Sequence, residues 1–330
     1  MAPVSDAASA HAFMNILLVA EEMAGLQVLK AVARSQHRVA GVLTSPPENP
    51  ASESSTLWKV AQDLGYKTWP AKMVKDPALA ESLRTEQIDL LLNVHSLYII
   101  HPDSLAAPRW GAYNLHPGPL PRYAGLNSVS WAIYRGEKEH GVTIHKMEAG
   151  IDTGATVFQE LFPIADDDTA FTVSFKCTQR GVALMLKLLD TVSATPDDLP
   201  LVPQDLTRRE YFGPEIPQKG WLSWLAPAQN IVNFVRACDY SPFHSPWGHA
   251  TTRLGNEDLD VIKVSRTGLP TEASPGTIGQ VSDSGAFVAA GDEWVLVKKL
   301  KRGDTYLAAA DVLRSGGRLD SSSHPPMSVT

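Results

Sequence analysis

Cysteine, long apolar runs and basic clusters are all scarce in this chain of 330 residues. Its two cysteines, Cys177 and Cys238, lie far apart and outside any paired motif, which argues against a disulfide scaffold and a cysteine-based zinc site. No apolar run approaches the ~20 residues of a membrane-spanning helix. The net charge is −7 and no basic block provides the positive footprint that nucleic acid binding needs, so we expect no nucleic-acid partner and no membrane contact.

Targeting signals are also missing from the N-terminal stretch. No Lys or Arg precedes Lys30, whereas a secretory signal needs a basic segment and a mitochondrial presequence is rich in Arg. We therefore expect a cytoplasmic protein. With 44% hydrophobic and 20% charged residues, the composition is that of a globular chain.

The N-terminal part of the chain alternates short apolar runs with helical patterns. This alternation predicts an α/β fold, with a parallel sheet covered by helices on both faces. The turn after the first run, residues 19–25, has neither a GxGxxG fingerprint nor a Walker lysine, so the fold assigns no nucleotide. The expected strands are residues 15–20, 39–44, 88–94, 112–115, 141–147 and 155–159, and the expected helices are residues 26–33, 56–64, 77–85, 128–134 and 172–189.

A second domain follows a linker rich in Pro and Asp at residues 191–209. One helical pattern and several short β-like runs separated by Gly and Asp turns predict a small barrel or sandwich, such as an OB-like barrel. We expect domains at residues 14–205 and 206–314, and a disordered tail at residues 315–330.

Two polar motifs could carry chemistry. Asn114 and His116 alternate on one face of an expected strand, just before a loop rich in Pro and Gly, where ligands bind in open α/β sheets. A helix-capping Asn and a structural His would give the same pattern. The second motif is Asp152, bracketed by Gly150 and Gly154. It matches half of an aspartic protease site, but that mechanism needs two such carboxylates, and a self-capped turn is the plainer alternative.

Taken together, these motifs resemble those of the folate-dependent formyltransferases in order and spacing. They are Asn114-Leu-His116, the loop at residues 117–125, Trp131-Ala-Ile with Gly136-Glu137, Gly141-Val-Thr, and Gly150-Ile-Asp-Thr-Gly154. The resemblance covers roughly residues 15–189 and extends into the second domain. It implies a Rossmann-like formyltransferase domain followed by a small OB-like β-barrel.

The resemblance also implies roles for particular residues. The implied catalytic residues are Asn114, His116 and Asp152. The residues implied to bind the formyl donor, 10-formyltetrahydrofolate, are Tyr98, Ile99, Ile100, Glu148, Ala149, Gly150 and Ile151. The residues expected at the acceptor pocket are Tyr123, Leu126, Asn127 and His145. Many family members have Arg where this chain has Ala124, and the sugar-specific enzymes have Arg at Leu126, so the acceptor remains open.

Elementary chemistry agrees with this assignment. An amine must be neutral to attack, and His is the side chain whose pKa lies closest to neutrality, so His116 is the expected base. Asn114 can donate to the formyl oxygen as it gains charge. Asp152 would orient His116 and raise its pKa. We expect no metal.

The sequence therefore predicts an N-formyltransferase acting on a small-molecule amine, an amino sugar or an amino acid, free or bound to a carrier protein. Residues 221–310 carry 8 Lys and Arg against 9 Asp and Glu, which disfavours a methionyl-tRNA formyltransferase. A 10-formyltetrahydrofolate hydrolase and a catalytically silent folate-binding module would carry the same motifs. The oligomeric state is left open.

Overall fold

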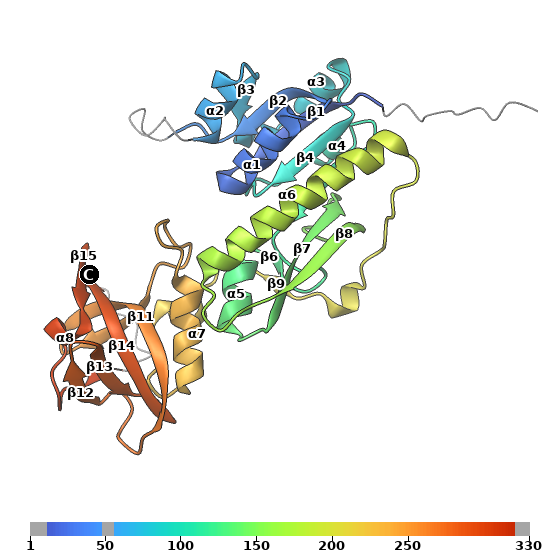
Figure 1. The fold of residues 1–330 in the computed structure, drawn as a ribbon. Helices are drawn as coiled ribbons and strands as arrows, with labels where there is room; N and C mark the ends of the chain where they lie inside the picture. Colours follow the sequence, from blue (N-terminus) through green and yellow to red (C-terminus); the bar gives the residue numbers. More distant parts are fainter. Residues whose placement is uncertain (1–11, 48–55, 321–330) are drawn as a thin grey trace, which may run out of the picture. The chain divides into compact units, whose positions relative to one another are not determined.

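The computed structural model describes residues 12–47 and 56–320 (Figure 1). They form two compact units. The first contains the described residues up to 125, with residues 141–162 and 175–211, and the second contains residues 126–140, 163–174 and 212–320. Within the described segments, no helix has the length and apolarity needed to cross a bilayer.

A seven-stranded sheet of order β3-β2-β1-β4-β5-β7-β8 forms the centre of the first unit. Its strands are β1 (Asn15–Ala20), β2 (Arg38–Thr44), β3 (Thr68–Pro70), β4 (Leu90–Val94), β5 (Ala112–His116), β7 (Glu139–Lys146) and β8 (Thr156–Pro163). The first five in chain order pair in parallel, but β7 runs antiparallel to β5. The sheet is therefore mixed, whereas the sequence predicted a parallel sheet. A parallel crossover needs a helix that packs back on the sheet. The helix between β5 and β7, α5 (Ser128–Tyr134), instead packs on α7 (Ala228–Cys238) in the second unit.

Apolar side chains cover both faces of this sheet, as a doubly wound fold requires. Along β1, Ile16 and Leu18 point into one core cluster, whereas Leu17 and Val19 point into the other. Such continuous apolar runs are typical of strands buried on both faces. The helices are α1 (Glu22–Ala33), α2 (Leu57–Asp63), η2 (Ala71–Lys75), α3 (Leu79–Thr85), α4 (Pro102–Leu105) and α6 (Ala170–Ala194), and a 3-10 turn, η3 (Leu206–Arg208), follows.

The second unit is built on an antiparallel sheet of order β12-β13-β14-β11-β10-β16, with β15 beside β14. The strands are β10 (Ala250–Leu254), β11 (Glu257–Pro270), β12 (Ile278–Ser282), β13 (Gly285–Ala289), β14 (Glu293–Arg302), β15 (Thr305–Ala308) and β16 (Leu319–Asp320). Shorter elements of this unit are η4 (Pro217–Gly220) and α8 (Ala309–Val312), and β6 (Ala124–Gly125) and β9 (Tyr211–Phe212) pair in a separate two-stranded sheet. This confirms the expected small β domain, which is a curled antiparallel half-barrel.

The C-terminal segment joins the two edges of this sheet. Leu319 pairs with Leu254 of β10, and its N–H also donates to the carbonyl of Gly276, just before β12, at 2.8 Å. The side chain of Leu319 is fully buried. The expectation of a disordered tail from Ser315 is therefore wrong for residues 315–320, because backbone pairing, which composition does not reveal, holds them. Residues 321–330 lie outside the described residues.

Segments 126–140 and 163–174 belong to the second unit, although we expected them in an N-terminal domain ending at residue 205. The packing of aromatic rings explains this grouping. Trp131 stacks on Phe212 with ring centroids 4.9 Å apart and meets Trp247 edge-on at 5.0 Å. Residues far apart in the sequence therefore form one core around α5 and α7.

Candidate active site

Strand alternation places Asn114 and His116 on one face of β5, as predicted. The opposing residues of β7 are His145 and Thr143, in register with Asn114 and His116. All four side chains are buried, with 9% of Asn114 and 3% of His116 exposed. Buried polar groups of this kind need hydrogen-bond partners, and the loop after β7 supplies a carboxylate, that of Asp152.

That loop brings Asp152 against all of these groups. Asp152 has a left-handed backbone, φ +54°, which Asp tolerates better than most residues. Its Oδ2 lies 3.5 Å from His116 Nδ1, and its Oδ1 lies 3.3 Å from His145 Nε2 and 3.5 Å from Asn114 Nδ2. The structure therefore brings the three predicted catalytic side chains together.

The charge of Asp152 is stabilised by its neighbours. Burial by itself would raise its pKa, since only 10% of the side chain is exposed. His116, His145 and the backbone N–H of Gly125, which donates to Oδ2 at 2.8 Å, outweigh burial and hold the pKa of Asp152 well below its ordinary value. Asp152 is therefore a carboxylate at neutral pH.

His116 is held by the loop that follows it. Its Nε2 donates to the carbonyl of Tyr123 at 2.7 Å, because a carbonyl oxygen can only accept. Burial lowers the pKa of His116, and the opposing effects of Asp152 and of Tyr123 do not reverse the shift. The predicted effect of Asp152 has the right sign, but the resulting pKa lies below the ordinary value because burial is stronger. The lowered pKa favours the neutral imidazole, and because Nε2 donates to Tyr123, the lone pair of that form is on Nδ1, facing Asp152.

Two glycines permit these close contacts. A Cβ on Gly118 would lie 2.8 Å from His116 Nε2, and one on Gly154 would collide with the carbonyl oxygen of Lys146. Both approaches are shorter than real Cβ contacts. The loops on either side of the site therefore need residues without side chains at these positions.

The formyl transferase family model matches residues 14–189, and the model of the formyl transferase C-terminal domain matches residues 216–316. The chain belongs to the formyltransferase family. The resemblance of the motifs to those of formyltransferases is therefore confirmed, and the protein is a formyl-transferring enzyme.

Relatives of this formyltransferase differ in the acceptors that their names state. A methionyl-tRNA formyltransferase of Synechococcus sp. (strain JA-3-3Ab) is 31% identical over 268 residues, covering 79% of this chain and 80% of the relative. The solved structure of WlaRD, a sugar 3N-formyl transferase, has a TM-score of 0.66 at 19% identity and covers 89% of this chain and 99% of that one. An N-formyltransferase from Helicobacter canadensis has the same TM-score at 18% identity, covering 86% and 99%. Both solved structures have the same fold as this chain.

The residues predicted to bind the donor adjoin the face of the sheet that carries the trio. Tyr98 and Met147 pack against the same apolar cluster as Ala112, and Ile100 is buried in it. Ile99 is 66% exposed, and residues 148–151 are exposed as well. Ile100 therefore contributes to the core, whereas Ile99 and the loop at residues 148–151 are free for ligand contact.

The predicted acceptor residues are not all in one unit. Tyr123 is buried, and its carbonyl accepts a hydrogen bond from His116 Nε2. His145 contacts Asn114 and Asp152 and is thus part of the trio's surroundings. Leu126 and Asn127 belong to the second unit, and their role at an acceptor pocket stays a prediction.

Sequence reasoning missed one polar side chain at this site. Asn93 of β4 is 5% exposed and donates from Nδ2 to Asn114 Oδ1 at 2.8 Å. The available signal was a polar residue inside an otherwise apolar strand, residues 90–94. No sequence signal marks the contact made by the carbonyl of Tyr123.

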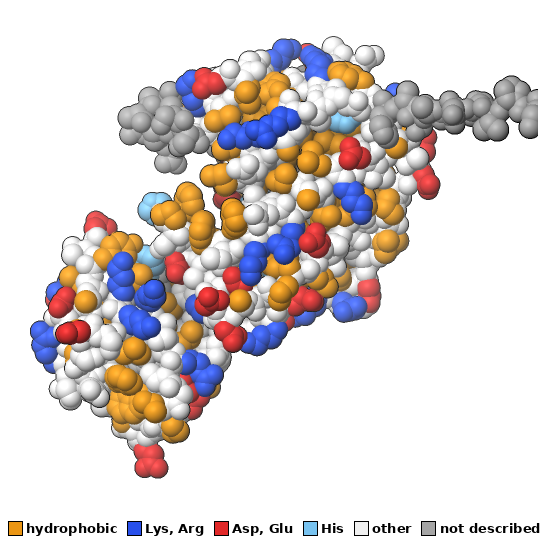
Figure 2. Space-filling view, viewed as in Figure 1, with side chains coloured by type: hydrophobic (Ala, Val, Ile, Leu, Met, Phe, Trp, Pro, Cys, Tyr) orange, Lys and Arg blue, Asp and Glu red, His pale blue; other side chains and the backbone are white. Residues whose placement is uncertain are grey.

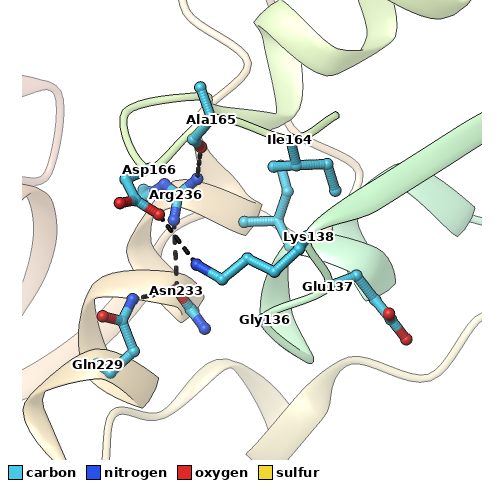
Figure 3. Close-up of a pocket in the computed structure, with 10 residues that line it drawn as sticks. Gly136, Glu137, Lys138, Ile164, Ala165, Asp166, Gln229, Asn233 and Arg236 are labelled. Atoms are coloured by element: carbon cyan, nitrogen blue, oxygen red, sulfur yellow. Dashed lines mark hydrogen bonds and ion pairs between the residues drawn. The ribbon is translucent and has the colours of Figure 1, made fainter. Parts of the chain in front are cut away.

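Two cavities lie apart from the trio. One in the second unit has a volume of about 120 Å³ (Figure 3). Within it the guanidinium of Arg236 donates to the carbonyls of Asp168 and Ala165 and to Asn233 Oδ1, while Lys138 pairs with Asp166. It is smaller than the roughly 300–1,000 Å³ of ligand pockets, and its cations are engaged within the protein.

The other cavity, of about 340 Å³, is lined by residues that include Arg109, Trp110 and Lys146. It lies at the amino end of β5, whereas His116 stands at the carboxyl end. No cluster of three His, Cys, Asp or Glu in residues 12–47 and 56–320 is arranged to hold a metal ion.

Proposed function

We propose that this formyltransferase moves a formyl group from 10-formyltetrahydrofolate to the primary amine of a small molecule. The observation that supports the assignment most directly is the contact of Asp152 with both His116 and Asn114, each at 3.5 Å. These three groups supply a base, a counter-charge and a hydrogen-bond donor, and formyl transfer needs all three.

Asn114 is the donor to the formyl oxygen. Transfer forms a bond between the acceptor nitrogen and the formyl carbon and breaks the bond from that carbon to the folate nitrogen. Negative charge develops on the formyl oxygen in between. The amide of Asn114 is preorganised by its neighbours, and loss of one such donor typically costs about 100- to 1,000-fold in kcat.

His116 and Asp152 take up the proton of the attacking amine. Because Nε2 donates to Tyr123, the proton is accepted at Nδ1, where the carboxylate of Asp152 stabilises the imidazolium. The same proton is then available for the departing folate nitrogen. The exposed residues at 148–151, together with Ile99, fit the role of contacting the pterin.

The paired charges of the second unit favour a small acceptor over tRNA. Three of its arginines pair with nearby carboxylates: Arg253 with Asp258, Arg266 with Glu293 and Arg302 with Glu257. Lys301 also lies beside Asp304. On the face shown in Figure 2, Lys and Arg side chains are interspersed with Asp and Glu. Phosphate binding needs uncompensated cations.

A formylation assay decides between the acceptors. The full chain is incubated with 10-formyltetrahydrofolate and, separately, nucleotide-linked amino sugars, amino acids on a carrier protein, and methionyl-tRNA, and the formylated product is identified by mass. Product from a small or carrier-bound amine supports the proposal. Formylation of methionyl-tRNA with salt-sensitive binding, or tetrahydrofolate release that no amine accelerates, would overturn it.

Site variants test the roles of the trio. His116→Ala and Asn114→Ala are each expected to lower kcat by about 100-fold or more, because the base or the oxyanion donor is lost. The dissociation constant of tetrahydrofolate should change little, since the pterin contacts are elsewhere. Near-native turnover in either variant would remove that residue from the mechanism.

A further inference from the structure

A row of amides and an imidazole crosses three strands next to the catalytic carboxylate. Asn93 of β4 is in register with Asn114 of β5, and Asn114 is in register with His145 of β7. Neighbouring strands lie about 4.8 Å apart, so side chains on the same face of such a row meet directly. All three residues are buried.

The direction of the hydrogen bonds in this row is set at its far end. The carbonyl of Lys146 can only accept, so His145 donates to it from Nδ1 at 2.9 Å. The carboxylate of Asp152 beside His145 can likewise only accept, and its Oδ1 lies 3.5 Å from Asn114 Nδ2. Asn114 therefore turns its amide nitrogen towards His145 and Asp152, and its oxygen towards Asn93.

Asn93 completes the row from the other side. Its Nδ2 donates to Asn114 Oδ1 at 2.8 Å, and its own Oδ1 is buried with no hydrogen-bond partner among the described residues. Among the described residues, the side-chain amide of Asn93 is therefore held by its hydrogen bond to Asn114. The terminal torsion of an Asn side chain has a broad, nearly two-fold profile, so without this bond little holds the amide of Asn114 in one orientation.

We propose that Asn93 is a positioning residue for formyl transfer, which locks the amide of Asn114 so that Nδ2 faces the formyl oxygen. This inference rests on the role given to Asn114 in the proposed function. It concerns the donor half of the reaction, so it does not depend on which amine is the acceptor.

Two substitutions of similar size test the proposal. In Asn93→Asp the carboxylate can only accept, so Asn114 rotates to donate to it and turns its oxygen towards the substrate. We expect kcat for tetrahydrofolate release to fall by about 100- to 1,000-fold, as for loss of an oxyanion donor. Asn93→Leu removes the bond without forcing rotation, and a smaller loss of at least about tenfold is expected.

The control places the same change at the other end of the sheet. Asn15 lies at the start of β1, where its side chain bonds to Arg38 and to the carbonyl of Gln87. Asn15→Asp should keep wild-type kcat. Melting temperature and the calorimetric dissociation constant of tetrahydrofolate are measured for every variant, and we expect the latter to stay within threefold in the Asn93 variants. Loss of tetrahydrofolate binding that accounts for the loss of turnover would overturn the proposal.

A double-mutant cycle separates positioning from a general structural role. In the Asn114→Ala background, Asn93→Leu should have no further effect on kcat, because Asn93 acts through Asn114. Multiplicative losses would refute the proposal. If Asn114→Ala is slow but both Asn93 variants are fast, only this inference fails; if Asn114→Ala itself is fast, the proposed role of Asn114 fails as well.

A spectroscopic measurement reports on the amide directly. In ligand-free protein labelled with ¹⁵N at asparagine, the side-chain signal of Asn114 is assigned by its loss in Asn114→Ala. It should shift in both Asn93 variants and remain in place in Asn15→Asp. An unchanged Asn114 signal in a folded Asn93→Asp variant would contradict the proposed lock.

Discussion

Replacing Asp152 by Asn tests the electrostatics of the site with little change in shape. The carboxylate lies 3.5 Å from His116 Nδ1 and accepts a hydrogen bond from the N–H of Gly125 at 2.8 Å. Asparagine retains one oxygen for Gly125 but carries no charge. In the variant, His116 would have to accept the proton of the amine without a counter-ion.

The expected loss follows from this distance. Two unit charges 3.5 Å apart interact by about 5 kcal/mol at an effective dielectric constant of about 20. Because the imidazolium spreads its charge over the ring, the value is an upper bound. A barrier higher by about 4 kcal/mol corresponds to roughly a 1,000-fold lower kcat.

Single-turnover release of tetrahydrofolate measures this loss across a pH range. The charge of Asp152 raises the pKa of His116, so its removal lowers that pKa further, and the acid limb of the rate profile should move to lower pH. Asp103→Asn, an exposed residue of α4, serves as the charge control. A kcat within tenfold of wild type, or an acid limb that moves to higher pH, would refute the electrostatic argument.

Three further outcomes are expected. In the wild type, the acid limb of kcat/KM should lie below pH 6.5, because burial lowers the pKa of His116; a limb above pH 7 would contradict this direction. Gly118→Ala would place a Cβ 2.9 Å from the carbonyl oxygen of Tyr123 and disturb its bond to His116, so kcat should fall by about tenfold or more, and unchanged kinetics would argue against the packing. Leu319→Ala should lower the free energy of unfolding by about 2–5 kcal/mol in a urea titration, whereas a loss under about 0.5 kcal/mol would mean that the C-terminal segment contributes little to the second unit.

Local patterns predicted the elements of this fold well, but not the relations between them. The helix expected to start at Ser128 is α5, and it does start there, because its apolar periodicity lies within the segment itself. The direction of β7 was not predictable in this way. It depends on α5 packing against α7, which is about 100 residues away in the sequence.

In the site, too, local patterns predicted individual residues but not the contacts between distant segments. Strand alternation was enough to place Asn114 and His116 on one face, but the contact with Asp152 joins residues 38 positions apart, and only the family resemblance indicated it. Asn93 left a weak trace as a polar residue within an apolar strand. The carbonyl of Tyr123 left none, since every residue has one, and its position depends on how the loop at residues 117–125 folds.

Burial and a neighbouring carboxylate act on His116 in opposite directions, and the reaction requires both. Before attack the imidazole must be neutral to accept a proton, and burial, which lowers its pKa, keeps it so. After proton transfer it is a cation inside the protein, and without a counter-charge that state would be high in free energy. Asp152, itself held ionised by its neighbours, stabilises the state that arises during the reaction more than the state that precedes it. Such a difference, rather than tight binding of either state, is what lowers a barrier. For this reason we expect the burial of His116 and the charge of Asp152 to be interdependent, so that opening the site to water would weaken the effect of Asp152 even where every contact of the trio is kept.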